Sequence, residues 1–83
     1  MPLSDRDLAI LKFEAEWLRH AGAKEEAIRA DLGLSPARYY QLLARLIDTT
    51  DAQEQDPMLV KRLRRIRDER QRARVARASG SPR

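Results

Sequence analysis

Arginine is the residue type whose number and placement in this chain point to chemistry. The 83 residues include 17 lysines and arginines against 13 aspartates and glutamates, which gives a net charge of +4. Residues 1–57 hold seven basic and eleven acidic groups, a net −4, whereas residues 58–83 hold ten basic and two acidic groups, a net +8. A segment of about 20 residues in which positive charge dominates is typical of a polyanion-binding region. The alternative is a basic helix that pairs with the acidic N-terminal helix of a neighbouring subunit.

The basic segment should supply binding that does not depend on nucleic-acid sequence. If about six phosphates are neutralised, the affinity falls steeply as the salt concentration rises. The cations that we expect to contact phosphate are Lys61, Arg62, Arg64, Arg65, Arg67, Arg70, Arg72, Arg74 and Arg77.

A second group of candidate residues lies on a predicted helix that starts with Ser35 as N-cap and Pro36 at the first helical position. Helical spacing places one apolar face on this segment, formed by Tyr39, Leu42, Leu43, Leu46 and Ile47. The opposite face carries Ala37, Arg38, Gln41, Ala44 and Arg45. These side chains are short or of types that read bases, and none is acidic.

The polar face predicts contacts in a DNA major groove. Arg38 and Arg45 suit guanine or phosphate, Gln41 suits adenine, and Ala37 suits a thymine methyl group. Ser35 and Tyr40 are better suited to phosphate oxygens. For Tyr40, half-buried packing against the following connection is an equal alternative.

Residues 27–42 have the spacing of a helix-turn-helix. Ile28 and Leu32 would seat the first helix, and Gly33 permits a left-handed backbone in the turn. Leu34 would fill the angle between the helices, and Ser35 caps the second one. The alternative is a plain helical hairpin with a glycine-containing turn, which apolar spacing alone does not separate from a DNA-binding motif.

Part of this motif carries a family pattern, which runs Gly33-Leu34-Ser35-x-x-Arg38-Tyr39-x-Gln41-Leu42. It resembles the recognition segment of the −35-reading helix-turn-helix of bacterial sigma factors, over about 20 residues. The resemblance implies that the second helix enters a major groove. The family normally has a small residue where this chain has Arg29, so either Arg29 extends outward or the helices cross at a wider angle.

A wider resemblance rests on residues 21–28, 35–40 and 56–63. These runs are similar to a family of small actinobacterial and actinophage proteins that is catalogued as a domain of unknown function. That resemblance implies a source and no mechanism.

The elements that must position these residues are all helical. Alanine, leucine, arginine and glutamate are frequent, and no segment alternates as a strand would, so the fold class is all-α. We expect a helix-turn-helix domain over 1–48, a polar linker over 49–56, a basic helix over 57–78 and a disordered tail over 79–83. Within the first domain, helices should cover 5–21, 24–32 and 36 to about 48.

The basic helix should begin with Asp56 as N-cap and Pro57 at its first position. Its apolar stripe of Leu59, Leu63 and Ile66 continues as Arg70, Ala73 and Arg77. The first half can therefore dock on protein, while the second half should project, or fold only on contact with a partner.

Several classes of protein are excluded by residue type. The chain has no cysteine, which rules out a disulfide framework and a cysteine zinc site. The single histidine, His20, is expected to be solvated and not a metal ligand. Carboxylates at Glu14, Glu16, Glu25 and Glu26 lack a concave site, and Trp17 belongs to the core by its helical phase. We expect no enzyme, cofactor, metal or small-molecule substrate.

The expected function is that of a DNA-binding transcriptional regulator or nucleoid-associated protein with double-stranded DNA as partner. No apolar run is long enough for a membrane and no secretory signal is apparent, so a cytoplasmic protein at the nucleoid is expected. The alternatives are an RNA- or ribosome-binding protein, and an adaptor that binds RNA polymerase or a sigma factor through residues 1–31. A surplus apolar face on the first helix suits a homodimer, unless the C-terminal helix fills that face.

Overall fold

A computed structural model describes residues 2–17 and 23–79 of the chain, and in these ranges every regular element is helical, which confirms the all-α class. α1 (Asp5–Trp17) begins behind Ser4, whose Oγ accepts a hydrogen bond from the Asp7 N–H at 3.1 Å. The Asp7 carboxylate in turn accepts a hydrogen bond from the Ser4 N–H at 3.4 Å, so the two residues cap the helix reciprocally. The expected continuation of this helix to residue 21, and its stop at Gly22, lie outside the described residues.

The segment predicted to be a helix-turn-helix consists of three consecutive helical elements. α2 (Lys24–Ala27) runs directly into η1 (Ile28–Leu32), a π-helical turn, and Gly33 then adopts a left-handed φ of 66°. α3 (Pro36–Leu46) starts with Ser35 as N-cap, whose Oγ accepts from the Arg38 N–H at 3.1 Å. The helical range 24–32, the start of α3, the turn glycine and the cap are as expected, whereas α3 ends at Leu46, short of the expected end near residue 48. Arg29 is exposed, so it extends outward from the wide π-helical turn, as one of the two expectations had it.

Replacing Gly33 should test the turn that separates the two helices. A Cβ atom at this position meets nothing within 4 Å, so Gly33→Ala causes no steric clash with the rest of the fold. The left-handed backbone is unfavourable for alanine, so the variant should lose about 1–2 kcal/mol of unfolding free energy. Urea unfolding followed by circular dichroism measures the loss. Gly33→Asn should lose less, because asparagine tolerates this conformation better. Equal stability of Gly33→Ala and the parent chain would contradict the role given to the turn.

The segment expected as a polar linker contains a helix, α4 (Thr50–Gln55). Thr49 caps it by accepting from the Ala52 N–H at 3.1 Å, while its hydroxyl donates to the Leu46 carbonyl at 2.8 Å. Ala52 is fully buried. The segment shows no apolar periodicity because this single alanine is its whole contribution to the core.

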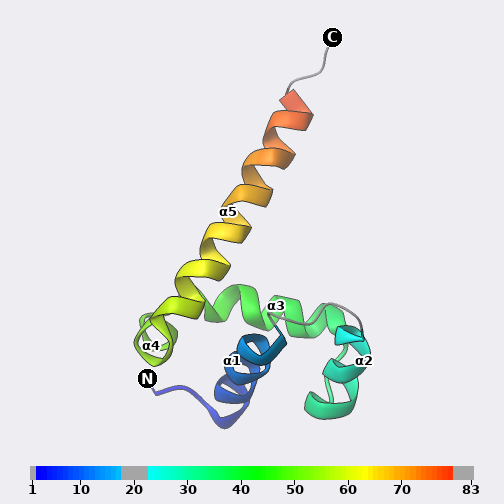
Figure 1. Ribbon diagram of the computed structural model, residues 1–83, viewed down its shortest axis with the longest axis vertical. Coiled ribbons are helices and arrows are strands. Elements are labelled where there is room, and N and C mark those ends of the chain that lie inside the picture. Colours follow the sequence, from blue (N-terminus) through cyan, green and yellow to red (C-terminus); the bar gives the residue numbers. More distant parts are fainter. Residues whose placement is uncertain (1, 18–22, 80–83) are drawn as a thin grey trace.

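α5 (Pro57–Ser79) is the predicted basic helix, and its Asp56 cap accepts from the Leu59 N–H at 3.3 Å. Leu59 is buried and Leu63 and Ile66 are partly buried, whereas residues 68–78 are all exposed. α5 leaves the bundle beside α4, and its distal end stands clear of the other helices (Figure 1). The distal half thus projects as a helix. The tail expected over 79–83 lies, apart from Ser79 at the end of α5, outside the described residues.

The core lies where α1 packs against α3, and the base of α5 closes one end. Its buried apolar members are Ile10, Leu11, Phe13, Ile28, Tyr39, Leu42, Leu43, Leu46, Ile47, Ala52, Leu59 and Val60. One expectation needs correction: Val60 is fully buried although the predicted stripe omitted it. On α1, Leu8 is 38% exposed. Trp17 stacks on Phe13 and packs against this core, as predicted. In the described ranges no helix has the length and apolar character to cross a bilayer.

Candidate nucleic-acid interface

The residues predicted to read bases lie together on the outer side of α3. Ala37, Arg38, Gln41 and Arg45 are all exposed, and we call them the reading face. They point outward because the opposite side of α3 is anchored by buried side chains, with Tyr39 at 0% exposure. Arg38 Nη1 lies 3.5 Å from Gln41 Oε1, a long contact that leaves both groups accessible to a ligand. The reading face therefore offers two guanidinium groups, an amide and a methyl group.

A buried polar cluster holds the N-terminal half of α3 against α1 and α2. Lys24 Nζ lies 3.0 Å and 3.2 Å from the two carboxylate oxygens of Glu14, and the Tyr39 hydroxyl donates to the same carboxylate. Burial raises the pKa of the Tyr39 phenol, and the hydrogen bond to Glu14 raises it further, so Tyr39 stays protonated as a donor. One residue from each of three helices meets in this cluster, which fixes the orientation of the reading face.

Sequence reasoning missed this role of Glu14. The residue is only 5% exposed, whereas the three carboxylates with which it was grouped as lacking a concave site are exposed in the structure. A signal was present: Glu14 lies four residues after Ile10 and three after Leu11, both buried, so helical spacing places it within the apolar arc of α1. A carboxylate in that position needs a buried partner, and the sequence does not say which cation supplies it.

The two predicted phosphate ligands on α3 lie near its N-terminus and are exposed. Ser35 uses its Oγ as acceptor in the helix cap, which leaves its hydroxyl hydrogen to donate. Tyr40 is 43% exposed, and its ring packs edge-on against Tyr39 at 5.1 Å, with Lys24 Nζ 5.4 Å from its centroid. Tyr40 is thus exposed, and its ring lies against Tyr39 of α3 and Lys24 of α2.

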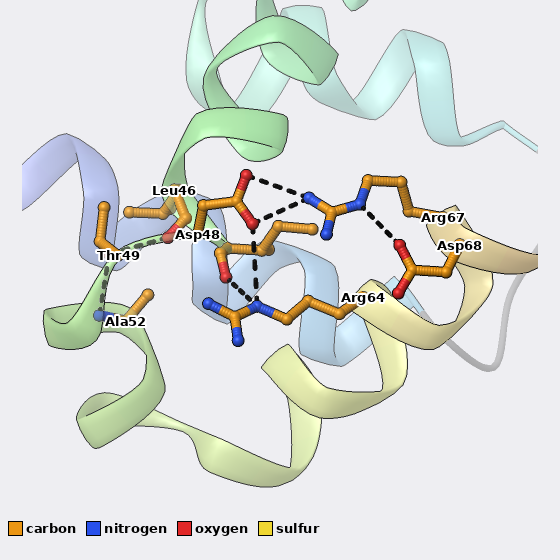
Figure 2. A network of polar contacts seen from close by, with 8 residues as sticks. Leu46, Asp48, Thr49, Ala52, Arg64, Arg67 and Asp68 are labelled. Carbon is orange, nitrogen blue, oxygen red and sulfur yellow. Dashed lines mark hydrogen bonds and ion pairs between the residues drawn. The ribbon is translucent and has the colours of Figure 1, made fainter. Parts of the chain in front are cut away.

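Two of the nine cations predicted to contact phosphate instead contact the end of α3 (Figure 2). Arg64 Nε donates to the Ile47 carbonyl at 2.7 Å. Arg67 Nη1 donates to both carboxylate oxygens of Asp48, at 2.9 Å and 3.1 Å. We call these contacts the Asp48 clamp. Cations are favoured at this position because the C-terminus of a helix carries partial negative charge. The last carbonyls of a helix also lack partners within the helix, so they can accept hydrogen bonds from such cations.

The other seven predicted phosphate ligands are exposed along α5. In the parts of the chain that the structure describes, none of them forms an ion pair. They are Lys61, Arg62, Arg65, Arg70, Arg72, Arg74 and Arg77. Beyond Glu69 the described part of α5 has four arginines and no acidic residue, so its distal half is a free cationic surface.

Features that could support other chemistry are few. An open surface pocket of about 330 Å³ is lined by Pro2, Leu3, Leu8, Asp51, Glu54 and Gln55. None of the four carboxylates considered from sequence lines it. Among the described residues no group of three or more histidine, cysteine or acidic side chains could hold a metal ion, and His20 lies outside them.

A comparison with protein families finds one match for this chain. A family model described as "Protein of unknown function (DUF3263)" matches residues 2–75. This range includes every helix from α1 to most of α5, and hence the reading face, the Asp48 clamp and all the exposed cations of α5 except Arg77. No curated protein and no solved structure matches the chain.

Proposed function

Since the chain belongs to this family of proteins of unknown function, we propose a function from its geometry: it binds double-stranded DNA, with α3 in the major groove and α5 on the phosphate backbone. The observation that carries the proposal is the exposed, acid-free reading face of α3 beside an exposed arginine-rich helix. A regulator of transcription or a nucleoid-associated protein would use such a surface.

The reading face fits the chemistry of base edges. The major groove is about 12 Å wide and admits one α-helix, and its guanines present two acceptors that an arginine can bond together. Arg38 and Arg45 can donate in this way, and Gln41 can both donate to and accept from adenine. Ala37 adds no bulk, so the backbone of α3 can approach the bases closely.

α5 fits the phosphate backbone. Its seven exposed cations lie along a helix whose distal end stands clear of the other helices (Figure 1), so a duplex can reach them without unfolding any packed element. Such contacts release counterions, position the protein and carry no sequence information. The net −4 of residues 1–57 repels DNA, which makes the cations of α5 necessary for binding.

Two other partners are alternatives that a binding experiment separates from duplex DNA. An arginine-rich helix also suits RNA, which proteins recognise mainly through single strands and shape. RNA polymerase or a sigma factor would bind through the acidic surface of residues 1–31. A second copy of the chain is a further alternative, because Leu8 and Met58 are exposed.

The test is selection of duplexes from a random pool, followed by affinity measurements on the enriched sequence. The double variant Arg38→Ala/Gln41→Ala should lose at least about 30-fold in affinity for that sequence, because each of the two bidentate base contacts discriminates by about 1–3 kcal/mol. Its affinity for unselected duplexes should change little.

The matched control is Lys12→Ala/Gln53→Ala, which removes the same charge and an amide from exposed positions of α1 and α4. It should bind the selected duplex like the parent protein. An equal loss in both double variants would show that charge alone drives binding. If single-stranded or duplex RNA binds more tightly than duplex DNA in competition, the partner is RNA and not DNA.

A further inference from the structure

We propose that α3 and the distal half of α5 engage one duplex as a single rigid body, with α5 over the minor groove that flanks the α3 site on one side only. The proposal rests on the proposed function and specifies its ligand: a duplex that continues about half a turn past the C-terminal end of α3. A single copy of the protein then protects the α3 site and the DNA on one side of it only.

The reading face leads directly to α5. Ala37, Gln41 and Ala44 follow one another at spacings of four and three residues, and Asp48 comes four residues later, just beyond the end of α3. Asp48 is the residue that Arg67 of α5 contacts. The side of α5 that bears Arg67 therefore borders the exposed side of α3.

The same side of α5 continues as arginine beyond the contact. Arg70, Arg74 and Arg77 follow Arg67 at spacings of three, four and three residues, which keeps them on one face of a helix. We call these three residues the arginine stripe. All are exposed, and in the described residues none has an ion-pair partner. The arginine stripe thus faces the space that a duplex on α3 would occupy.

The Asp48 clamp holds α5 in this direction. A helix attached through one exposed ion pair could swing, but α5 is held by two guanidinium groups on adjacent acceptors, the Ile47 carbonyl and the Asp48 carboxylate (Figure 2). Its base is also held by Leu59 and Val60, which are buried in the core. Arg64 and Arg67 are therefore positioning residues, and the arginine stripe makes the contacts with DNA.

Helix length matches the distance to a neighbouring groove. From Arg67 to Arg77 the helix rises about 15 Å, at 1.5 Å per residue. One turn of DNA is about 34 Å, so the far end of the arginine stripe lies close to half a turn from Arg67. Half a turn separates a major groove from the adjacent minor groove, where arginine is favoured by the dense phosphate charge on both sides.

Directed cleavage of DNA tests the placement of α5. The chain has no cysteine, so Ala78→Cys creates a single attachment site for an iron chelate that cuts DNA nearby. On the selected duplex, the cuts should cluster on one side of the α3 contacts, about half a turn away, with the offset between strands that marks a minor groove. Cuts on both sides, or cuts spread along the duplex, would overturn the proposal.

The clamp is tested in the same assay by adding Arg67→Gln, with Arg6→Gln as the matched control. Both changes remove one charge, but Arg6 is exposed on α1, has no proposed DNA contact and forms no ion pair within the described chain. Cuts should spread at least twofold wider with Arg67→Gln and stay clustered with Arg6→Gln. Equal patterns would show that the clamp does not position α5. Absence of duplex binding by the parent protein would instead refute the proposed function itself.

Discussion

Replacement of Arg70, Arg72, Arg74 and Arg77 by glutamine is expected to lower the affinity for any duplex by about 100- to 1000-fold at 0.1 M salt. Each phosphate contact contributes about 0.9 to the slope of log affinity against log salt concentration, so loss of the arginine stripe should lower the slope by about 3. Arg72 lies on the side of α5 that bears Arg65 and should add little. Glutamine is nearly as good a helix former as arginine, so the change removes charge and leaves α5 helical. Fluorescence anisotropy at several salt concentrations measures both quantities.

A matched pair of double variants separates the position of these charges from their number. Arg74→Gln/Arg77→Gln and Arg6→Gln/Lys12→Gln each remove two exposed cations, from α5 and from α1 respectively. Only the first should reduce the salt slope by nearly 2. A slope that stays constant in the fourfold variant contradicts the role of α5, and an affinity that rises would mean that α5 obstructs the reading face.

Loss of the Glu14 carboxylate should be the most damaging single change to stability. Glu14→Ala leaves Lys24 and the buried Tyr39 hydroxyl without their shared acceptor, and breaking a buried ion pair on one side costs about 3–5 kcal/mol. A chain of this size has an unfolding free energy of only about 4–12 kcal/mol. We therefore expect a large decrease in the urea concentration at the midpoint of unfolding, measured by the helical circular dichroism signal.

The neighbouring Glu16→Ala variant is the control, because Glu16 is exposed on the same helix. Its unfolding free energy should stay within about 0.5 kcal/mol of the parent value. Tyr39→Phe removes only the donor and should give an intermediate loss. If Glu14→Ala and Glu16→Ala unfold at the same urea concentration, the buried cluster does not hold α3 in place.

The helices near the reading face were predictable because their signals are local. The Ser35 cap, Pro36 at the first helical position and the left-handed Gly33 each act within a few residues, so the sequence alone determines where α3 begins. The spacing of Tyr39 and Leu42 also determined which side of α3 is buried, and hence that Arg38 and Gln41 are exposed.

The short helix α4 was missed for a different reason. Its apolar content is one alanine, so periodicity could not reveal it, and its cap at Thr49 resembles the many threonines that begin no helix. Val60 was missed because contact with α4 widens the buried side of α5 beyond the stripe of Leu59 and Leu63. Both errors arise where one element's packing depends on the position of another.

For charged side chains, too, the sequence determined some properties and only the tertiary structure decided others. The sequence by itself determined that residues 58–83 are cationic and that a helix begins at Pro57, because net charge and helical signals are sums over neighbouring residues. Only the tertiary structure decided that Arg67 contacts Asp48 while Arg70 stays free, and that Glu14 is buried with Lys24. An arginine bonds phosphate, carboxylate and carbonyl oxygens with the same donors, so its partner is decided by which acceptor the fold brings within reach.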